Sequence, residues 1–246
     1  MPAATQMRVA ARVIAILCLA GLSGSGAVAQ LAPPIQMAAL APAEEAHRAT
    51  PAPAHTGPFG MASTHGGTMP AKWRILQPAI AMEIRLLDSC RADPQSCTPA
   101  AARFLSIVDT ARARAGRARI GEINRAINLA IRPESDVVRF GAPDVWTTPL
   151  TTFAAGAGDC EDYAIAKYVA LREAGVAPED LRIVIVRNLA RAEDHAVAAA
   201  RVDDQWLILD NRHMLLLNDS QATGLTPLVT LDHNDGPETF TVAQAG

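Results

Sequence analysis

Apolar residues recur at helical spacing once the periodic part of the chain begins, near Trp73. They stand three and four positions apart, which places them on one face of a helix, in residues 73–90, 98–116 and 121–131. Thr98 and Pro99 add a helix start, because proline is favoured at the first helical position. Three helices are therefore predicted in this half of the chain.

The period changes after a stretch rich in Pro, Gly and Thr, residues 132–159, which is expected to be a surface loop. Residues 160–175 show one more helical stripe, with Asp159 at the N-cap position and a glycine after the helix end. Strand-like runs follow at 181–188, 195–202 and 205–211. Helices followed by antiparallel strands predict an α+β domain.

The first 29 residues have the features of a secretory signal peptide. Arg8 and Arg12 form a positive region, an apolar run follows, and Ala27–Ala29 offers a small-residue cleavage site. That run is shorter than the roughly 20 residues of a membrane span, and no later segment is apolar for long enough. An exported protein without a transmembrane span in its mature chain is expected.

Residues 30–70 show neither a helical nor a strand period and are expected to be a flexible leader. Its histidines, His47, His55 and His65, are interpreted as solvated linker residues, with a metal-binding tail as the alternative. The remainder, 71–246, is long enough for one domain with a hydrophobic core.

The net charge excludes one class of function. The net charge is −3, and it becomes −5 when the signal peptide removes two arginines. Nucleic-acid binding is not expected, because it needs concentrated Lys and Arg.

Cys90 and Cys97 bracket a short loop and are predicted to form a disulfide in an oxidising compartment. Since Cys18 lies in the signal peptide, Cys160 is left unpaired, which suggests a reactive role or intermolecular pairing.

Cys160, His195 and Asp210 are a candidate nucleophile, base and orienting carboxylate. If Asp203–Asp204 is a two-residue turn, Val197 lies opposite Asp210, and His195 becomes a diagonal neighbour of Asp210 on the same sheet face. A slip by one residue would separate the two. Cys160 stands at a helix N-terminus, which stabilises a thiolate. Each residue alone could be structural, but together they favour nucleophilic catalysis.

Three carboxylates, Asp159, Glu161 and Asp162, stand beside Cys160 in the sequence. Negative charge so close should raise the pKa of the thiol and oppose formation of the thiolate. One explanation is that these acids only complement the helix dipole at the first turn.

The blocks GDCEDYAIAKY, DHAV, LDN, DVWTTP and EINRAIN together resemble the bacterial transglutaminase-like cysteine proteinases. The resemblance extends from about Pro58 to the C-terminus. It implies a papain-like or transglutaminase-like α+β core, with N-terminal helices before an antiparallel sheet. It also implies that the triad is Cys160, His195 and Asp210.

The resemblance offers a second explanation for the carboxylates, namely a calcium site. It implies that Asp159 and Glu161 bind Ca²⁺. Because calcium takes six to eight oxygen ligands, Asp162 and Asp144 are expected as further candidates. A bound divalent ion would offset the negative charge around Cys160.

The resemblance further implies a periplasmic calcium-dependent endopeptidase. Its expected substrate is a large surface adhesin, cut near a small-residue (Ala-Ala type) site, and its expected regulator is an inner-membrane cyclic-di-GMP receptor. Two alternatives remain open on the same residues: transglutaminase-type acyl transfer to an amine, and a non-catalytic calcium-gated binding module.

Two features bear on the substrate groove. The backbone N–H of Cys160 is a candidate oxyanion donor, and Trp146 is a candidate second donor, a groove wall or a packing residue. Where family members carry bulky apolar residues after the histidine, this chain has three alanines, Ala198–Ala200. That difference is expected to thin the strand and alter the groove.

Overall fold

The computed structural model describes residues 57–61 and 68–233. These belong to the compact unit Thr50–Gly246. The expected signal peptide, the three leader histidines and Cys18 lie outside the described residues. Two parts of the expected leader belong to the described fold. Phe59 of the short 3-10 turn η1 (Pro58–Gly60) donates its backbone N–H to Oδ2 of Asp219 at 2.8 Å. Residues 68–70 begin the first helix, and Met69 packs against the core, so the helical part starts before the expected boundary at residue 71.

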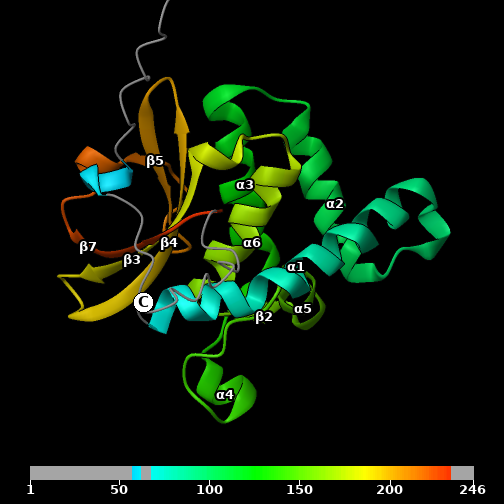
Figure 1. Cartoon of the computed structure of the whole chain (residues 1–246), viewed down its shortest axis with the longest axis horizontal. Coiled ribbons are helices and arrows are strands. Elements are labelled where there is room, and N and C mark those ends of the chain that lie inside the picture. Colours follow the sequence, from blue (N-terminus) through cyan, green and yellow to red (C-terminus); the bar gives the residue numbers. More distant parts are fainter. Residues whose placement is uncertain (1–56, 62–67, 234–246) are drawn as a thin grey trace, which may run out of the picture. The chain divides into compact units, whose positions relative to one another are not determined.

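Helices make up the first half of the described chain, as the apolar pattern predicts (Figure 1). In order they are α1 (Thr68–Ala92), α2 (Pro99–Arg112), α3 (Gly116–Ala130), α4 (Asp136–Phe140), α5 (Pro149–Ala155) and α6 (Cys160–Glu173). The predicted helix start is present, since Thr98 caps α2 by accepting the backbone N–H of Ala101 at 3.1 Å. Together with the sheet that follows, these helices confirm the α+β prediction.

The second half forms a five-stranded antiparallel sheet with the order β6-β5-β4-β3-β7. Its strands are β3 (Leu181–Asn188), β4 (Glu193–Val202), β5 (Gln205–Leu209), β6 (Leu217–Asn218) and β7 (Leu225–Leu231). The sequence pattern missed the two edge strands, β6 and β7. β6 is only two residues long, and the burial of β7 alternates between half-buried and exposed positions along most of its length.

The register between β4 and β5 is the predicted one. Val202 pairs with Gln205, and Ala198 pairs with Leu209. Asp203 and Asp204 form the turn, and both have positive φ angles, 51° and 57°, as a type I′ turn requires. Extending this register from the ladder end places Asp210 on the same side of the sheet as His195.

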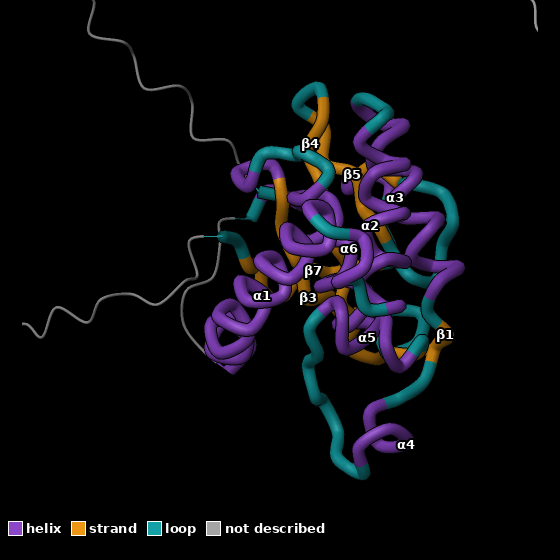
Figure 2. Tube along the Cα trace, turned by 90° about the vertical axis from the view of Figure 1, so that its right-hand side faces the viewer, coloured by secondary structure: helices purple, strands orange, loops and turns teal. Residues whose placement is uncertain are grey.

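The main hydrophobic core lies between the sheet and its helices, with α6 packed on β3 and β4. Figure 2 shows α6 among the other helices. The inward residues of β4 are small, namely Ala196, Ala198 and Ala200, whereas Val197 and Ala199 belong to a second cluster on the opposite face. Two of the three consecutive alanines therefore face the core with α6.

The stretch 132–159 is not the plain surface loop that its composition suggested. It contains α4 and α5, and its two ends pair as a small parallel sheet of β1 (Arg132–Pro133) and β2 (Ala157–Gly158). Leu150 and Phe153 of α5 are buried, whereas α4 projects from the helices (Figure 2). Proline and glycine mark the ends of these short helices, so composition alone hides them.

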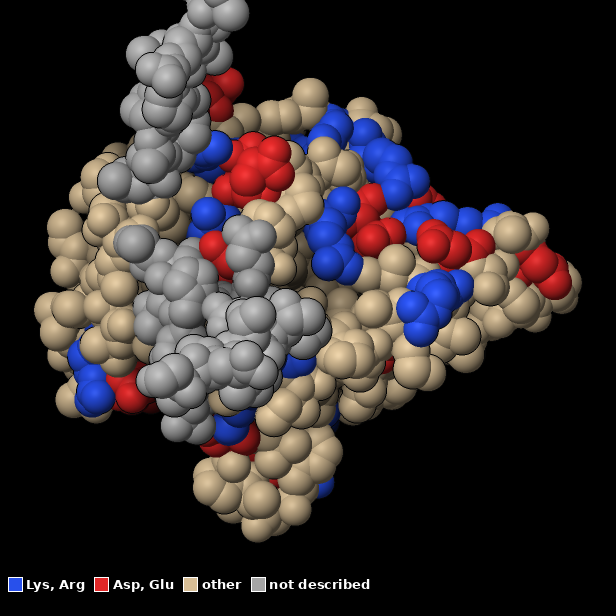
Figure 3. All heavy atoms as spheres, viewed as in Figure 1, with Lys and Arg blue, Asp and Glu red and all other residues tan. Residues whose placement is uncertain are grey.

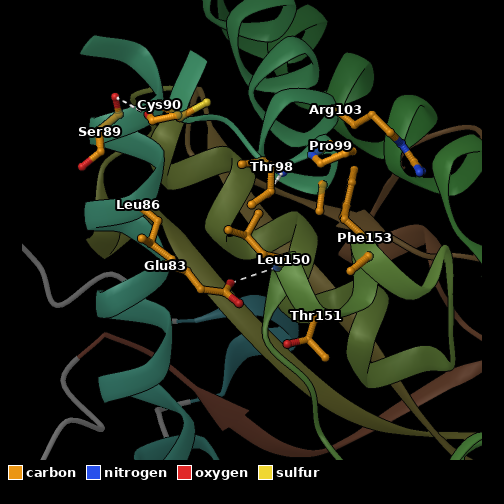
Figure 4. Close-up of a pocket in the computed structure, with 14 residues that line it drawn as sticks. Glu83, Leu86, Ser89, Cys90, Thr98, Pro99, Arg103, Leu150, Thr151 and Phe153 are labelled. Carbon is orange, nitrogen blue, oxygen red and sulfur yellow. Dashed lines mark hydrogen bonds between the residues drawn. The ribbon is translucent and has the colours of Figure 1, made fainter. Parts of the chain in front are cut away.

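A disulfide joins Cys90 at the end of α1 to Cys97, with the Cα atoms 4.7 Å apart. Cys90 lines a cavity of about 690 Å³ between α1, α2 and α5 (Figure 4). There Glu83 accepts the backbone N–H of Leu150 at 2.9 Å and so caps α5. None of the three candidate catalytic residues lines this cavity.

Acidic and basic side chains are intermixed on the face drawn in Figure 3, without an extended basic surface. Among the described residues, no helix is both long enough and apolar enough to cross a membrane.

Candidate active site

His195 and Asp210 form a buried pair at the end of the β4–β5 hairpin. Nε2 of His195 lies 2.8 Å from Oδ1 of Asp210, and the two residues are 1% and 5% exposed. The backbone N–H of Arg212 also donates to Oδ1 of Asp210, at 2.9 Å. Burial raises the pKa of Asp210, but the hydrogen bonds from His195 and Arg212 and the charge of Lys167 lower it below its usual value overall. Asp210 is thus held as a carboxylate that orients the ring.

Two asparagines of α3 hold the segment that carries Asp210. Nδ2 of Asn128 donates to the backbone oxygen of Asp210 at 3.0 Å, and Nδ2 of Asn124 donates to that of His213 at 3.0 Å. Buried side-chain amides of this kind fix a loop whose backbone has left the sheet ladder. This contact gives a physical reason for the EINRAIN block, in which the two asparagines stand four residues apart on one helix face.

Cys160 is the first residue of α6 and lines a cavity of about 310 Å³ together with His195. The second ring nitrogen of His195, Nδ1, is buried without a hydrogen-bond partner. Sγ of Cys160 instead donates to Oε2 of Glu161 at 3.1 Å. Burial, and next the charge of Glu161, raise the pKa of the Cys160 thiol well above its usual range. Cys160 is therefore protonated in this arrangement.

Gly158, two residues before Cys160, allows the chain to turn from β2 into α6. A Cβ at Gly158 would lie 2.8 Å from Cβ of Asp162, a contact that real Cβ atoms do not make. Any larger residue would push α6 away from the strand that precedes it.

Three acids, Asp136, Asp159 and Glu161, form a cluster beside the thiol. Their nearest carboxylate oxygens all lie within 4.8 Å of one another. Oδ1 of Asp136 and Oδ1 of Asp159 are buried and accept no hydrogen bond. Burial, followed by the charge of Glu161, raises the pKa of Asp159 to about 8. Buried carboxylate oxygens without hydrogen bonds, at such spacing, suit a hard cation such as calcium, which takes carboxylate ligands.

Asp159 also occupies the predicted N-cap position of α6, yet its side chain makes no capping hydrogen bond. If these acids only complemented the helix dipole, their carboxylates would lie against the first turn of the helix. The unpartnered oxygen of Asp159 favours the metal explanation instead.

The structure places the two further candidate ligands, Asp162 and Asp144, outside this cluster. Asp162 is fully buried and accepts hydrogen bonds from the backbone N–H of Thr147, at 2.9 Å, and from the Thr147 hydroxyl, at 2.6 Å; it also pairs with Arg139. Asp144 is bound to Lys72 at 2.5 Å. Both carboxylates therefore have close cationic partners, whereas the ion pair of Asp136 with Arg139 is longer, at 3.9 Å.

Asp136 was not among the sequence-derived candidates. It begins α4, 23 residues before Asp159, and the pairing of β1 with β2 closes the intervening segment on itself. Its other oxygen, Oδ2, accepts the backbone N–H of Val145. The sequence offered a weak signal only, since Ser135 and Asp136 resemble an ordinary helix start.

Trp146 lines the cavity with Cys160, and its indole N–H donates to Oδ1 of Asp144 at 2.9 Å. That donor is therefore already engaged, and Trp146 is placed as a wall of the cavity rather than as an oxyanion donor. Asp194 lies at the same cavity and pairs with Arg187 at 2.9 Å.

Comparison with known proteins identifies the family of the chain. Residues 79–224 match the family described as bacterial transglutaminase-like cysteine proteinase. The solved structure of Legionella pneumophila LapG is 25% identical, with a TM-score of 0.52, over 60% of this chain and 84% of that one. Its calcium-bound form gives the same values, and its EGTA-treated form is 25% identical over 59% and 81%, with a TM-score of 0.51. No curated protein matches the chain. The chain therefore belongs to the bacterial transglutaminase-like cysteine proteinases and is a cysteine peptidase of that type.

Proposed function

We propose that the protein is a calcium-dependent endopeptidase in which Cys160 is the nucleophile, His195 the base and then the acid, and Asp210 the residue that orients His195. The observation that carries this proposal is the His195 ring. One nitrogen is held by Asp210 at 2.8 Å, and the other is unpartnered beside the cavity that contains Cys160. A ring held at one nitrogen and free at the other suits proton transfer.

The chemistry follows from these roles. His195 takes the thiol proton through Nδ1, and the sulfur of Cys160 attacks a peptide carbonyl to form a tetrahedral intermediate. The backbone N–H of Cys160, at the start of α6, is a donor for its oxyanion. His195 then protonates the leaving amine, and water hydrolyses the resulting thioester. Asp210 stabilises the imidazolium that forms in both halves of the reaction.

The arrangement of Cys160 and Glu161 needs a change before this chemistry can start. Glu161 accepts a hydrogen bond from the Cys160 thiol and raises the pKa of that thiol. Asp136, Asp159 and Glu161 would hold calcium through their carboxylates. A bound calcium ion would supply positive charge next to the sulfur and favour the thiolate. Glu161 would then be engaged as a ligand and no longer hold the thiol protonated.

Support for calcium also comes from the similarity to LapG, which has been solved in a calcium-bound form. The resemblance of the sequence to its family extends the proposal to the substrate, a large surface adhesin cut near small residues, and to the regulator, an inner-membrane cyclic-di-GMP receptor. It likewise extends to a periplasmic location, for which the predicted signal peptide in residues 1–29 is the sequence support.

Peptide profiling with purified protein tests the activity. We expect cleavage of peptides with small residues before the cut, in calcium and not in EGTA. The activity should be lost in Cys160→Ala and in His195→Gln. Equal cleavage after bulky residues would remove the support for an Ala-Ala type site.

Two other functions use the same residues. Acyl transfer would be favoured if an added primary amine entered the product faster than water. A non-catalytic calcium-gated module would be favoured if a thiol probe labelled native Cys160 no more selectively than denatured protein.

A further inference from the structure

A buried lysine lies on the helix that begins with Cys160 and has no role in the chemistry above. Lys167 stands two turns after Cys160 on α6, and it is 0% exposed. Lysine is almost never fully buried without a partner, because removing its charge from water is costly. A buried lysine beside a catalytic pair therefore points to a function.

The contacts of Lys167 do not compensate for its burial. Nζ donates to the backbone oxygen of Leu209 at 3.4 Å and lies 5.8 Å from the centre of the Tyr163 ring. An ammonium has three donors, and 3.4 Å exceeds the usual range for an N–H···O bond. Burial lowers the pKa of Lys167 to about 7, against the opposing charge of Asp210. The residue is thus destabilised as a cation.

Leu209 is the last residue of β5, and Asp210 follows it directly. Lys167 therefore touches the strand end that presents the orienting carboxylate. The groups around Asp210 come from several elements: His195 of β4 at 2.8 Å, His213 with its Nε2 at 3.9 Å, Lys167 of α6, and Asn128 of α3 at the backbone oxygen. The guanidinium of Arg212 is paired with Glu193 at 2.9 Å.

We propose that Lys167 is a positioning residue of the peptidase, which acts on His195 through Asp210. Its Nζ, 3.4 Å from the backbone oxygen of Leu209, connects the helix that begins with Cys160 to the strand end that carries Asp210. Its charge, when present, competes with the imidazolium of His195 for the same carboxylate. The proposal rests on the proposed function, because it requires His195 and Asp210 to serve Cys160.

The test compares wild type with Lys167→Met, in calcium, on a fluorogenic peptide with a small-residue cut site. Loss of the contact between Lys167 and Leu209 is expected to lower kcat about tenfold or more with little change in KM. Small misplacements of catalytic groups are costly to the rate. Activity is also measured as a function of pH. Loss of the positive charge is expected to move the limb of the pH–rate profile on which His195 loses its proton upward by about one pH unit. Thermal stability should be equal or higher, since replacing a buried ion with an apolar residue is often stabilising.

Two further variants separate these effects from general core damage. Lys167→Gln keeps a hydrogen-bond donor for Leu209 without the positive charge. It should therefore recover part of kcat, while the pH limb assigned to His195 stays as high as in Lys167→Met. Leu171→Met changes another fully buried residue one turn later on α6, and it should leave the limb in place. Unchanged kcat and limb in Lys167→Met, or the same changes in Leu171→Met, would overturn the proposal.

A spectroscopic readout keeps this test independent of turnover. The ring N–H of His195 that bonds Asp210 should give a downfield proton resonance in the Cys160→Ala protein, and Lys167→Met should move it. If no peptide is cleaved but the resonance moves, the proposed function fails and the coupling stands. If peptides are cleaved and neither the resonance nor the limb moves, the coupling fails.

Discussion

The thiol of Cys160 and the carboxylate of Glu161, its neighbour in the chain, are hydrogen-bonded with Sγ and Oε2 3.1 Å apart. The proposed nucleophile is thus hydrogen-bonded to an acid rather than to its proposed base. The same acid belongs to the cluster with Asp136 and Asp159. One side chain therefore links the ionisation of the thiol to the proposed calcium site.

Glu161→Gln tests this link. In EGTA, alkylation of Cys160 by iodoacetamide should become about tenfold faster or more, because removing a charge this close lowers a pKa by about one unit or more. Calcium should accelerate the wild type but hardly the variant. Glu173→Gln, at the far end of α6 and paired with Arg91 at 3.1 Å, is the matched control. An alkylation rate of Glu161→Gln equal to wild type in EGTA would contradict the link.

Asp136→Asn tests the proposed ligand that the sequence did not reveal. Calcium affinity, measured by titration calorimetry, should fall about tenfold or more, because ligand charge tunes calcium affinity over several decades. Asp144→Asn removes an acid of the same loop that is bound to Lys72, so its affinity should match wild type. Equal losses in the two variants would show that general charge, rather than ligation, holds the ion.

Asp162→Asn separates structural acids from ligands. Asp162 is fully buried and paired with Arg139, whose side chain is 6% exposed. Breaking this pair leaves the buried Arg139 with only the longer ion pair to Asp136, at 3.9 Å. Loss of one partner of a buried pair costs about 3 kcal/mol or more. The free energy of unfolding should fall by that amount in urea, both in EGTA and in calcium. A loss that calcium restores would make Asp162 a ligand after all.

The raised pKa of Asp159, about 8, predicts how stability depends on pH without calcium. The folded state keeps a proton that the unfolded carboxyl releases near pH 4, so stability is full at low pH and declines as pH rises toward 8. The melting temperature in EGTA should therefore fall between about pH 5 and about pH 7, and less in Asp159→Asn. Calcium affinity should rise over the same range, since binding displaces the proton. A flat wild-type profile would contradict this account.

The strands around His195 and Asp210 were predictable because local chemistry determines their register. Asp203 and Asp204 accept the positive φ angles of a tight turn, and alternation then places both residues on one face. The loop before Cys160 was not predictable, because buried polar contacts hold it together rather than an apolar period. Asp162 with Thr147 and Arg139 is such a contact, and it joins residues 15 and 23 positions apart.

Asp136 and Lys167 were missed for related reasons. An aspartate that begins a short helix looks like an ordinary cap, and only the closure of β1 on β2 brings it to Asp159. A lysine in an amphipathic helix is expected to reach solvent, whereas α6 is buried continuously from Glu161 to Leu171. The number of neighbours around a helix is a property of the whole fold.

The most direct test compares released and surface proteins of cells that carry wild type or Cys160→Ala, with calcium or EGTA, and maps new N-termini by mass spectrometry. We expect a large surface protein to be shed, with a new N-terminus after a small residue, only with intact Cys160 and calcium. Identical N-termini in all four samples would contradict a calcium-dependent endopeptidase that uses Cys160.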